Sequence, residues 1–386
     1  MTYLKNYLNG LQQNPELVQS ITQTTDGFME KLAQTDETKI VRNTLLLGNV
    51  QSGKTGQVLG IVSALADKEH KFFIYLTTDS VDLQNQTLSR VQKSLPLFSV
   101  LSENDTHHFN DIFQKDKPVI AVIKKNSRIL KKWRNHLVGQ NYLKGYPLVI
   151  IDDEADAASL NTQINKGKVS TINQLLDDIK KTCNQNLFIE VTATPQSILL
   201  QNQQSDWQPE FVQYFEAGHD YIGGNFVFTE PKSFIVHLID EELEEMQDES
   251  AVIATGLARA MNTYLLTCAE FALTNRQPCN FAIHPSVRVA DHNAFADKLR
   301  EYLNQIVFAL NQNEDVRAEF QDIWMHDLHK TKPDIQHFDD IYTKMCELLE
   351  KQAIKILVLN SKTINNPNLD LGFNVIVGGN VIGRGL

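Results

Sequence analysis

The sequence predicts an α/β protein in which helices cover both faces of parallel sheets. From about residue 41 onward, short apolar runs alternate with amphipathic stretches of helical spacing. Such alternation is typical of buried parallel strands joined by crossover helices. In the first half of the chain we expect five strands within the runs NTLLLGN, KFFIYLTT, PVIAVIKKN, PLVIIDDE and NLFIEVTAT.

The 386 residues are enough for two or three domains at about 150 residues each. We expect a helical lead-in over 1–40, a first α/β lobe over 41–225, and an acidic linker with a long helix over 226–277. A second α/β lobe is expected over 278–386, with strands in CNFAIHPS, IKILVLNS and FNVIVGG. Because NVIGRGL follows a strand without a closing helix, we expect this second sheet to be incomplete.

The composition restricts the function classes. A net charge of −11, from 36 basic and 47 acidic residues, is unlike a protein that coats nucleic acid through bulk positive charge. Contact with nucleic acid would need a local groove. No apolar run approaches the roughly 20 residues that cross a bilayer, and the first residues lack the apolar core of a signal peptide. We therefore expect a cytoplasmic protein with no membrane partner.

A phosphate-binding loop is predicted directly after the first strand. The segment GNVQSGKT matches the pattern GxxxxGK[ST] and precedes a stretch that can be helical. Glycines let backbone N–H groups surround phosphate oxygens, the lysine reaches the β- and γ-phosphates, and the threonine binds Mg²⁺. The predicted ATP-binding residues of this loop are Gly48, Asn49, Val50, Gln51, Ser52, Gly53, Lys54 and Thr55.

An acidic cluster follows the strand that begins at Leu148. Carboxylates at the tip of a buried strand lie where open α/β sheets bind their ligands. We expect Asp153 and Thr55 to hold Mg²⁺. Glu154 is the expected catalytic base, which deprotonates the attacking water, and Lys54 is the second predicted catalytic residue. The neighbouring frame, with Asp152 as the metal ligand, remains open, and an acidic cluster alone is commonly a solvated loop.

A third motif, TATP at residues 192–195, follows another buried strand. After a phosphate loop and an acidic DEAD box, this order resembles motif III of superfamily 2 helicases. That motif links hydrolysis to domain movement, so Thr192, Thr194 and Asp156 are predicted coupling residues.

The chain resembles the Z1-domain family, a helicase-like group found with bacterial restriction-modification and phage-defence genes. The nucleotide motifs occur in many ATPases, whereas YIGG, IHPS and VGGNVIGRGL are more specific to this family. The resemblance implies two RecA-like lobes, with ATP and Mg²⁺ between them and nucleic acid running across both. It rests on GNVQSGKT (48–55), IDDEAD (151–156), TATPQ (192–196), HDYIGG (219–224), IHPS (283–286), VLNS (358–361) and VGGNVIGRGL (377–386).

The last of these segments resembles motif V, which would place Arg384 near the ATP site. The arginine that completes the site in such helicases usually belongs to motif VI, which this sequence does not reach. We therefore expect ATP binding with weak hydrolysis, unless Arg384 substitutes for the missing arginine.

Two segments are candidates for nucleic-acid contact. Basic residues after the strand PVIAVI recur at helical spacing and could form one positive stripe or a solvated helix face. A second segment, LTTDSVDLQNQ, resembles motif Ia, in which hydroxyls meet a phosphate. The predicted contacts are Lys124, Lys125, Arg128, Lys131 and Lys132 in the first segment, and Thr78 and Gln86 in the second.

The leading hypothesis is therefore an ATPase motor acting on DNA, in a restriction or anti-phage system whose nuclease lies in another subunit or further along the chain. Two alternatives remain. One is a nucleotide-dependent assembly module that does not translocate, and the other is a P-loop ATPase acting on a small molecule. The sequence does not distinguish DNA from RNA.

Overall fold

The computed structural model describes residues 2–109, 117–139, 145–157, 159, 169–202, 207–219, 221–229, 253–286, 288–312, 316–360, 368–379 and 382. The chain divides into two compact units, Met1–Phe226 and Val227–Leu386, which are described separately.

The first unit is built on a parallel sheet of seven strands in the order β3-β4-β2-β5-β6-β1-β7. All five strands predicted in this half of the chain are confirmed, and the two edge strands, β3 and β7, were not predicted. The strands are β1 (Val41–Leu47), β2 (Phe72–Thr77), β3 (Ser99–Ser102), β4 (Val119–Lys124), β5 (Leu148–Asp153), β6 (Asn186–Thr192) and β7 (Phe211–Tyr214).

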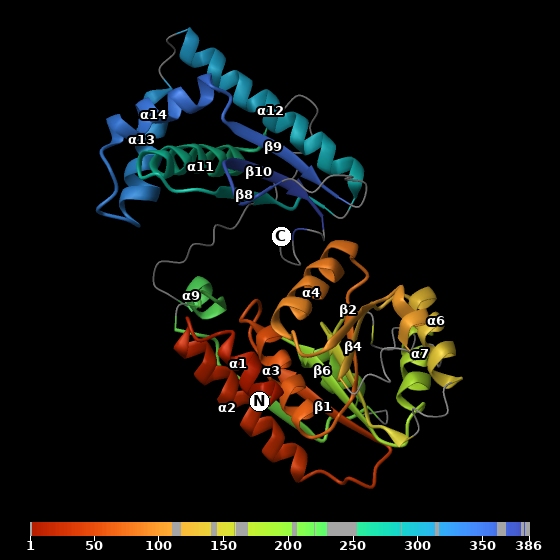
Figure 1. Cartoon of the computed structure of the whole chain (residues 1–386). Helices are drawn as coiled ribbons and strands as arrows, with labels where there is room; N and C mark the ends of the chain where they lie inside the picture. The colour runs from red at the N-terminus through yellow and green to blue at the C-terminus, as the bar shows by residue number, and fades with distance from the viewer. Residues whose placement is uncertain are drawn as a thin grey trace. The chain divides into compact units, whose positions relative to one another are not determined.

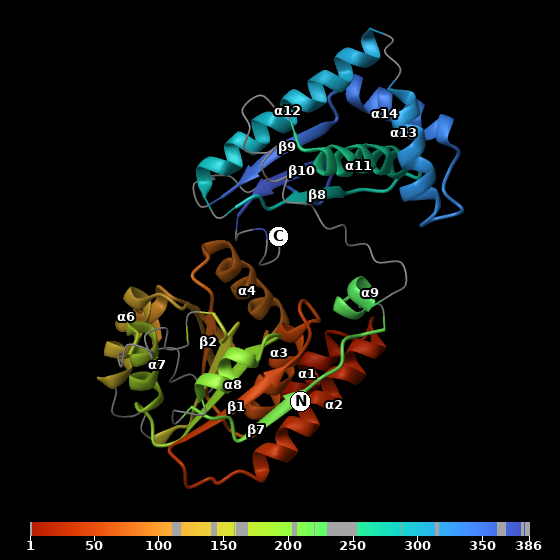
Figure 2. The ribbon, with the colours of Figure 1, turned by 180° about the vertical axis from the view of Figure 1, so that it is seen from behind.

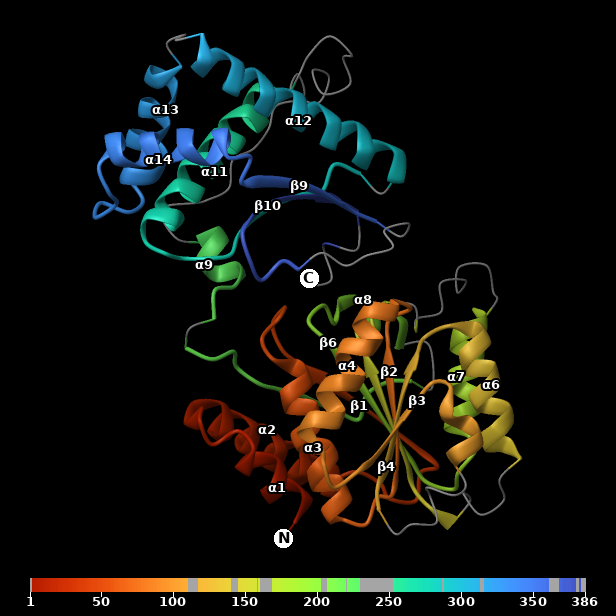
Figure 3. The same ribbon diagram turned by 45° about the horizontal axis from the view of Figure 1, so that its top comes forward.

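Helices cover both faces of this sheet. In Figures 1 and 3, α1, α2 and α3 lie on one side of the sheet and α6 and α7 on the other. The helices are α1 (Tyr3–Asn9), α2 (Pro15–Ala33), α3 (Lys54–Asp67), α4 (Val81–Ser94), the 3₁₀ helix η1 (Asp105–His108), α6 (Ser127–Val138), α7 (Thr171–Lys180), α8 (Gln196–Asn202) and α9 (Gly224–Thr229).

Alternation along the strands produces a core on each face. In β2, Phe73 and Tyr75 join the core under α1–α3, whereas Phe72 and Ile74 join the core under α6 and α7. Successive side chains of a strand point to opposite faces, so an apolar residue is needed at every position. This is why these strands are continuous apolar runs and could be predicted.

The expected lead-in, residues 1–40, packs on the helix that follows the phosphate loop. The Tyr7 hydroxyl donates a 2.9 Å hydrogen bond to the backbone oxygen of Gly56. A Cβ atom at Gly60 would lie 2.5 Å from Cγ2 of Ile21 and 2.8 Å from Oγ1 of Thr25. Helices α1 and α2 therefore belong to the first unit and support the position of α3.

The second unit has a parallel sheet of three strands in the order β8-β10-β9 (Figure 2). The predicted strands and the helix around 291–312 are present. Helix α11, expected in the connection between the lobes, packs on β8 and α14 in the core of this unit. The elements are α11 (Thr255–Leu273), β8 (Cys279–Ile283), α12 (Val289–Asn311), α13 (Arg317–Ile323), the π-helix η4 (Trp324–His329), α14 (Phe338–Glu350), β9 (Ile354–Leu359) and β10 (Phe373–Gly378).

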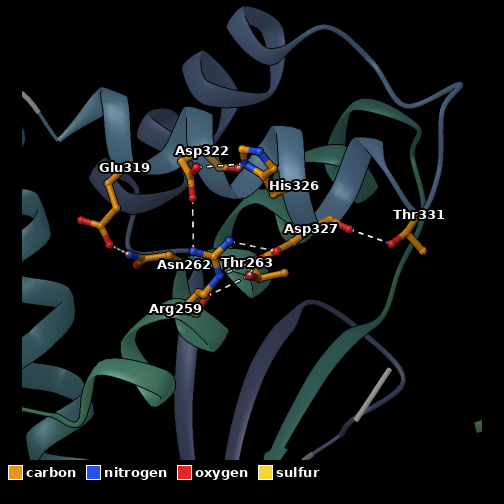
Figure 4. A network of polar contacts seen from close by, with 8 residues as sticks. All are labelled: Arg259, Asn262, Thr263, Glu319, Asp322, His326, Asp327 and Thr331. Carbon is orange, nitrogen blue, oxygen red and sulfur yellow. Dashed lines mark hydrogen bonds and ion pairs between the residues drawn. The ribbon is translucent and has the colours of Figure 1, made fainter. Parts of the chain in front are cut away.

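A polar network connects α11 with α13 and the π-helix (Figure 4). The guanidinium of Arg259 donates to both carboxylate oxygens of Asp327, at 2.9 and 3.0 Å, and to Asp322 at 3.2 Å. Asp322 also lies 2.9 Å from Nδ1 of His326. Because these side chains are partly exposed, solvent weakens the ion pairs and the network adds little stability.

No helix in the described part of the chain is both long and apolar enough to cross a lipid bilayer.

Lys180, the last residue of α7, is a lysine buried in the first unit. Its Nζ donates a 3.0 Å bond to Oδ1 of Asn43 and lies 3.5 and 3.4 Å from the ring centroids of Phe188 and Trp207. Burial nevertheless lowers the pKa of Lys180 to about 7, against the opposing charge of Glu190. The group is therefore neutral in the folded chain over a range in which it is charged when unfolded.

The unfolded chain then binds more protons than the folded chain between pH 7 and the ordinary lysine pKa of 10.5. The free energy of unfolding should rise with pH across this window, by about 1.4 kcal/mol per pH unit for one proton. The Lys180→Met variant should lack this contribution, which denaturant unfolding of both proteins at pH 7, 8 and 9 measures. Parallel pH profiles for parent and variant would contradict the assignment.

Candidate active site

The loop between β1 and α3 has the geometry of an anion cradle. The Gly48 N–H donates a 3.3 Å bond to the Thr192 carbonyl at the end of β6. A Cβ atom at Gly48 would lie 2.2 Å from the Phe215 ring, and Gly53 has φ +88° with nothing within 4 Å of an added Cβ. No side chain caps the N-terminus of α3, so its first N–H groups can bind an anion.

Lys54 lies among the carboxylates predicted to act with it. Partial burial lowers the pKa of Lys54, and the negative charges of Asp153, Glu154 and Asp156 oppose this shift. Its Nζ donates a 3.0 Å bond to the backbone oxygen of Asn49 within the loop. The loop lysine and the acidic cluster, 99 positions apart in the sequence at Lys54 and Asp153, therefore form one local charge cluster.

Strand alternation separates the two candidate metal ligands. Asp153 lies two positions after Ile151 and therefore on the same face of β5, the face that packs in the core under α3. Asp152 lies two positions after Ile150, on the face that packs in the core under α6 and α7. Asp152 is 0% exposed and pairs with Lys125. Of the two frames left open by the sequence, only that of Asp153 places the carboxylate on the face of the phosphate loop.

Tyr75 organises the predicted metal ligands. Its hydroxyl donates a 2.9 Å bond to Oδ2 of Asp153, and the nearby Thr55 side chain opposes the rise in the pKa of this hydroxyl that burial causes. Burial away from water raises the pKa of Asp153, although the hydrogen bond from Tyr75 and the charges of Lys125 and Lys54 favour the ionised form. A carboxylate and a hydroxyl linked in this way fit Mg²⁺, which takes few protein oxygens beside phosphate and water.

Glu154, the predicted base, has an uncommon backbone conformation. Its φ is +51°, in the left-handed region that non-glycine residues rarely adopt. Its N–H donates a 3.1 Å bond to Oδ1 of Asp153, and its carbonyl accepts one of 2.9 Å from the Ala157 N–H. Such strain is frequent at functional positions, where surrounding contacts hold it.

The predicted coupling residues are in direct contact. The hydroxyls of Thr192 and Thr194 each donate a 2.7 Å bond to the carboxylate of Asp156. The Thr194 N–H donates a 2.9 Å bond to Oγ1 of Thr192. The segment after β5 is thereby tied to the end of β6, the strand beside β1.

The predicted basic stripe is smaller than expected, because α6 begins only at Ser127. Lys124 is still in β4 and lies 3.4 Å from the Glu103 carboxylate. The prediction that Lys125 contacts nucleic acid is wrong for this structure, because its side chain is 0% exposed and pairs with Asp152 at 3.0 Å. Helical spacing cannot align residues that precede the helix.

Three basic residues of the stripe do share an exposed face of α6. Arg128, Lys131 and Lys132 are exposed and are spaced at i, i+3 and i+4, so they lie side by side. The opposite face buries Leu130 and Trp133. The Trp133 indole donates a 3.1 Å bond to the Glu103 carbonyl, so this ring packs against the sheet and cannot stack on a base.

The remaining predicted residues differ in their accessibility. Gln86 is exposed on α4. Thr78 is 6% exposed, and its buried hydroxyl has no hydrogen-bond partner in the described part of the chain. The predicted phosphate contact of Thr78 is therefore inaccessible in this conformation. Arg384 lies outside the described residues, as do its neighbours 383, 385 and 386.

Sequence reasoning missed two tyrosines at the site. Tyr75 lies inside an apolar strand run, which gave no reason to single it out. Tyr221, in the YIGG segment, donates a 2.5 Å bond to the Val50 carbonyl of the phosphate loop. A Cβ atom at Gly223 would lie 2.3 Å from its ring, so glycine at this position lets Tyr221 reach the loop.

The resemblance to the Z1-domain family that the sequence predicted is confirmed by a family model. Residues 256–386 match the Z1 domain. This Z1 match lies within the second unit of the chain. No match was found among curated proteins.

Several solved structures resemble the chain, among them two helicases and a restriction-modification enzyme. The helicase domain of Hef from Pyrococcus furiosus is 15% identical, with 83% of this chain and 72% of that chain covered and a TM-score of 0.35. The DUF1998 helicase MrfA bound to DNA and AMPPNP is 12% identical, with coverages of 75% and 38% and a TM-score of 0.40. The type ISP restriction-modification enzyme LlaGI is 16% identical, with coverages of 86% and 32% and a TM-score of 0.34.

The chain thus spans about half the length of the MrfA chain and less than half that of the LlaGI chain. Identities and TM-scores this low assign no activity, substrate or partner to the Z1-containing chain.

Proposed function

We propose that this chain is the ATP-hydrolysing core of a helicase-type motor that acts on DNA. The observation that supports it best is the meeting of three sequence-distant motifs at the carboxyl ends of β1, β5 and β6. Lys54 lies among the carboxylates of Asp153, Glu154 and Asp156, and Asp156 accepts hydrogen bonds from Thr192 and Thr194. A nucleotide site joined to a hydroxyl pair on the neighbouring strand suits a motor that transmits hydrolysis.

Each residue has a specific role in the proposed reaction. The loop N–H groups and Lys54 bind the phosphates and orient the γ-phosphoryl group. Thr55 and Asp153 hold Mg²⁺, which neutralises developing negative charge when bound. Glu154 accepts a proton from a water molecule while the oxygen of that water attacks the γ-phosphorus. The bond between the γ-phosphorus and the β,γ-bridging oxygen breaks. The products are ADP and inorganic phosphate.

We further propose that Arg128, Lys131 and Lys132 contact the DNA backbone. An exposed row of positive side chains on a chain of net charge −11 supplies the local contact that phosphates require. The resemblance to the Z1-domain family suggests a restriction or phage-defence assembly in the cytoplasm, with a nuclease or other subunit as partner.

The test is the ATPase rate with and without DNA, together with the salt dependence of DNA binding. We expect DNA to raise the rate of the parent protein. The variant Lys131→Glu/Lys132→Glu should lose this stimulation, and its plot of log Kd against log salt concentration should be shallower by about two. The slope changes because DNA binding releases about one counterion fewer for each phosphate contact that is lost.

The control is Lys68→Glu/Lys93→Glu, which makes the same charge change at exposed lysines at the ends of α3 and α4. This control should keep the parent's stimulation and salt slope. Equal slopes in the two double variants would remove α6 from the DNA path. An ATPase rate indifferent to DNA, with an oligomeric state that changes on adding nucleotide, would support the assembly module instead.

A further inference from the structure

Lys125 has three partners at the end of β5. Its Nζ lies 3.0 Å from Oδ1 of Asp152 and donates 2.7 Å hydrogen bonds to the backbone oxygens of Asp153 and Glu154. An ammonium group has three N–H donors and no acceptor, so two of them bond to backbone oxygens and the ion pair with Asp152 is the third contact. Burying a charged side chain is often less favourable than burying an apolar side chain of similar volume. Stability alone therefore does not explain why a lysine occupies this buried position.

The contacts with the two carbonyls fix the backbone that carries the predicted base. Glu154 has a φ of +51°, and a non-glycine residue in this region is strained. One side of the segment is held by β6, because the Ala155 N–H donates a 3.1 Å bond to the Val191 carbonyl. Lys125 holds the other side through the peptide oxygens on both sides of the strained φ angle.

Asp152 is the ion-pair partner of the lysine. Its carboxylate is on the opposite face of β5 from that of Asp153, inside the core under α6 and α7. A buried carboxylate there provides the countercharge for Lys125 without facing the phosphate loop. The pair therefore places a cation behind the carboxylate segment, where its hydrogen bonds go to the main chain of the predicted catalytic residues.

We infer that Lys125 is a positioning residue for ATP hydrolysis, which acts by holding the backbone oxygens of Asp153 and Glu154 so that the Glu154 carboxylate faces the attacking water. This inference rests on the proposed function. Lys125 acts through Glu154 and contributes to turnover, whereas Lys54 contributes to nucleotide binding. Loss of Lys125 should therefore lower kcat and leave nucleotide affinity unchanged.

The test uses the full chain with Lys125→Met and Asp152→Asn combined. Removing Lys125 alone would leave the Asp152 charge buried without a partner and destabilise the fold, so both charges are removed together. We expect cooperative unfolding and an affinity for a non-hydrolysable ATP analogue within about threefold of the parent. The kcat should fall by about 10–100-fold, the usual effect of losing a residue that orients a functional group.

The control is Lys117→Met, the same substitution at an exposed lysine before β4, which should keep the parent's kcat. A parent-like kcat in the double variant would overturn the inference. So would joint loss of analogue affinity and cooperative unfolding, since Lys125 would then be needed for folding. A parent protein that binds no nucleotide would instead defeat the proposed function, and with it this inference.

Discussion

Replacing Lys54 by alanine is expected to weaken ATP binding by about 100-fold or more, because two charge-assisted hydrogen bonds to phosphate are lost. Removal of the Lys54 side chain also deprives the neighbouring carboxylates, which favour its charged form, of their cation. Calorimetric titration of the variant with a non-hydrolysable ATP analogue and Mg²⁺ measures the change.

The matched control is Lys68→Ala, at the exposed C-cap of the same helix α3. This variant should bind the analogue as tightly as the parent, and saturating analogue should raise the Tm of both proteins by mass action. Parent-like affinity in Lys54→Ala would show that the loop of residues 48–55 does not bind the nucleotide.

Glu154→Gln should separate binding from hydrolysis. Glutamine has nearly the same size but cannot accept the proton of the attacking water, and a lost general base commonly costs about 10²–10⁴ in rate. We expect undiminished analogue affinity, with kcat lowered by that factor and ATP trapped on the protein. Single-turnover hydrolysis of radiolabelled ATP measures the chemical step directly.

Glu69→Gln is the control for this experiment, because Glu69 is also a non-glycine residue of positive φ, at 67°, but lies exposed after α3. Its single-turnover rate should equal that of the parent. If Glu154→Gln also hydrolyses ATP at the parent's rate, another residue activates the water.

The fold could be predicted where burial on both faces imposed a continuous apolar run. This holds for β1, β2, β4, β5 and β6 and for β10 of the second unit, whereas β8 and β9 are only partly buried and were predicted from their apolar residues alone. The edge strands β3 and β7 have only four residues each and include polar ones, so no run was long enough to stand out. The packing of α2 on α3 depends on Gly60, where a Cβ atom would meet Ile21 and Thr25, and sequence spacing gave no signal at this position.

The site could be predicted where a motif fixes the chemistry locally. The loop of residues 48–55, the acidic cluster and TATP each follow a strand, and parallel strands bring their carboxyl ends to one edge. Lys125 was misassigned because helical spacing was applied across the last residues of β4. Its true contacts, like those of Tyr75 and Tyr221, are with residues distant in the sequence, which only the folded arrangement reveals.

The proposed nucleotide site is tested most directly by a crystal structure of the chain with a non-hydrolysable ATP analogue and Mn²⁺ in place of Mg²⁺. We expect the triphosphate in the loop of residues 48–55, with anomalous scattering from one Mn²⁺ beside Thr55 and Asp153. Analogue bound elsewhere, with this loop empty and no metal beside Asp153, would contradict it.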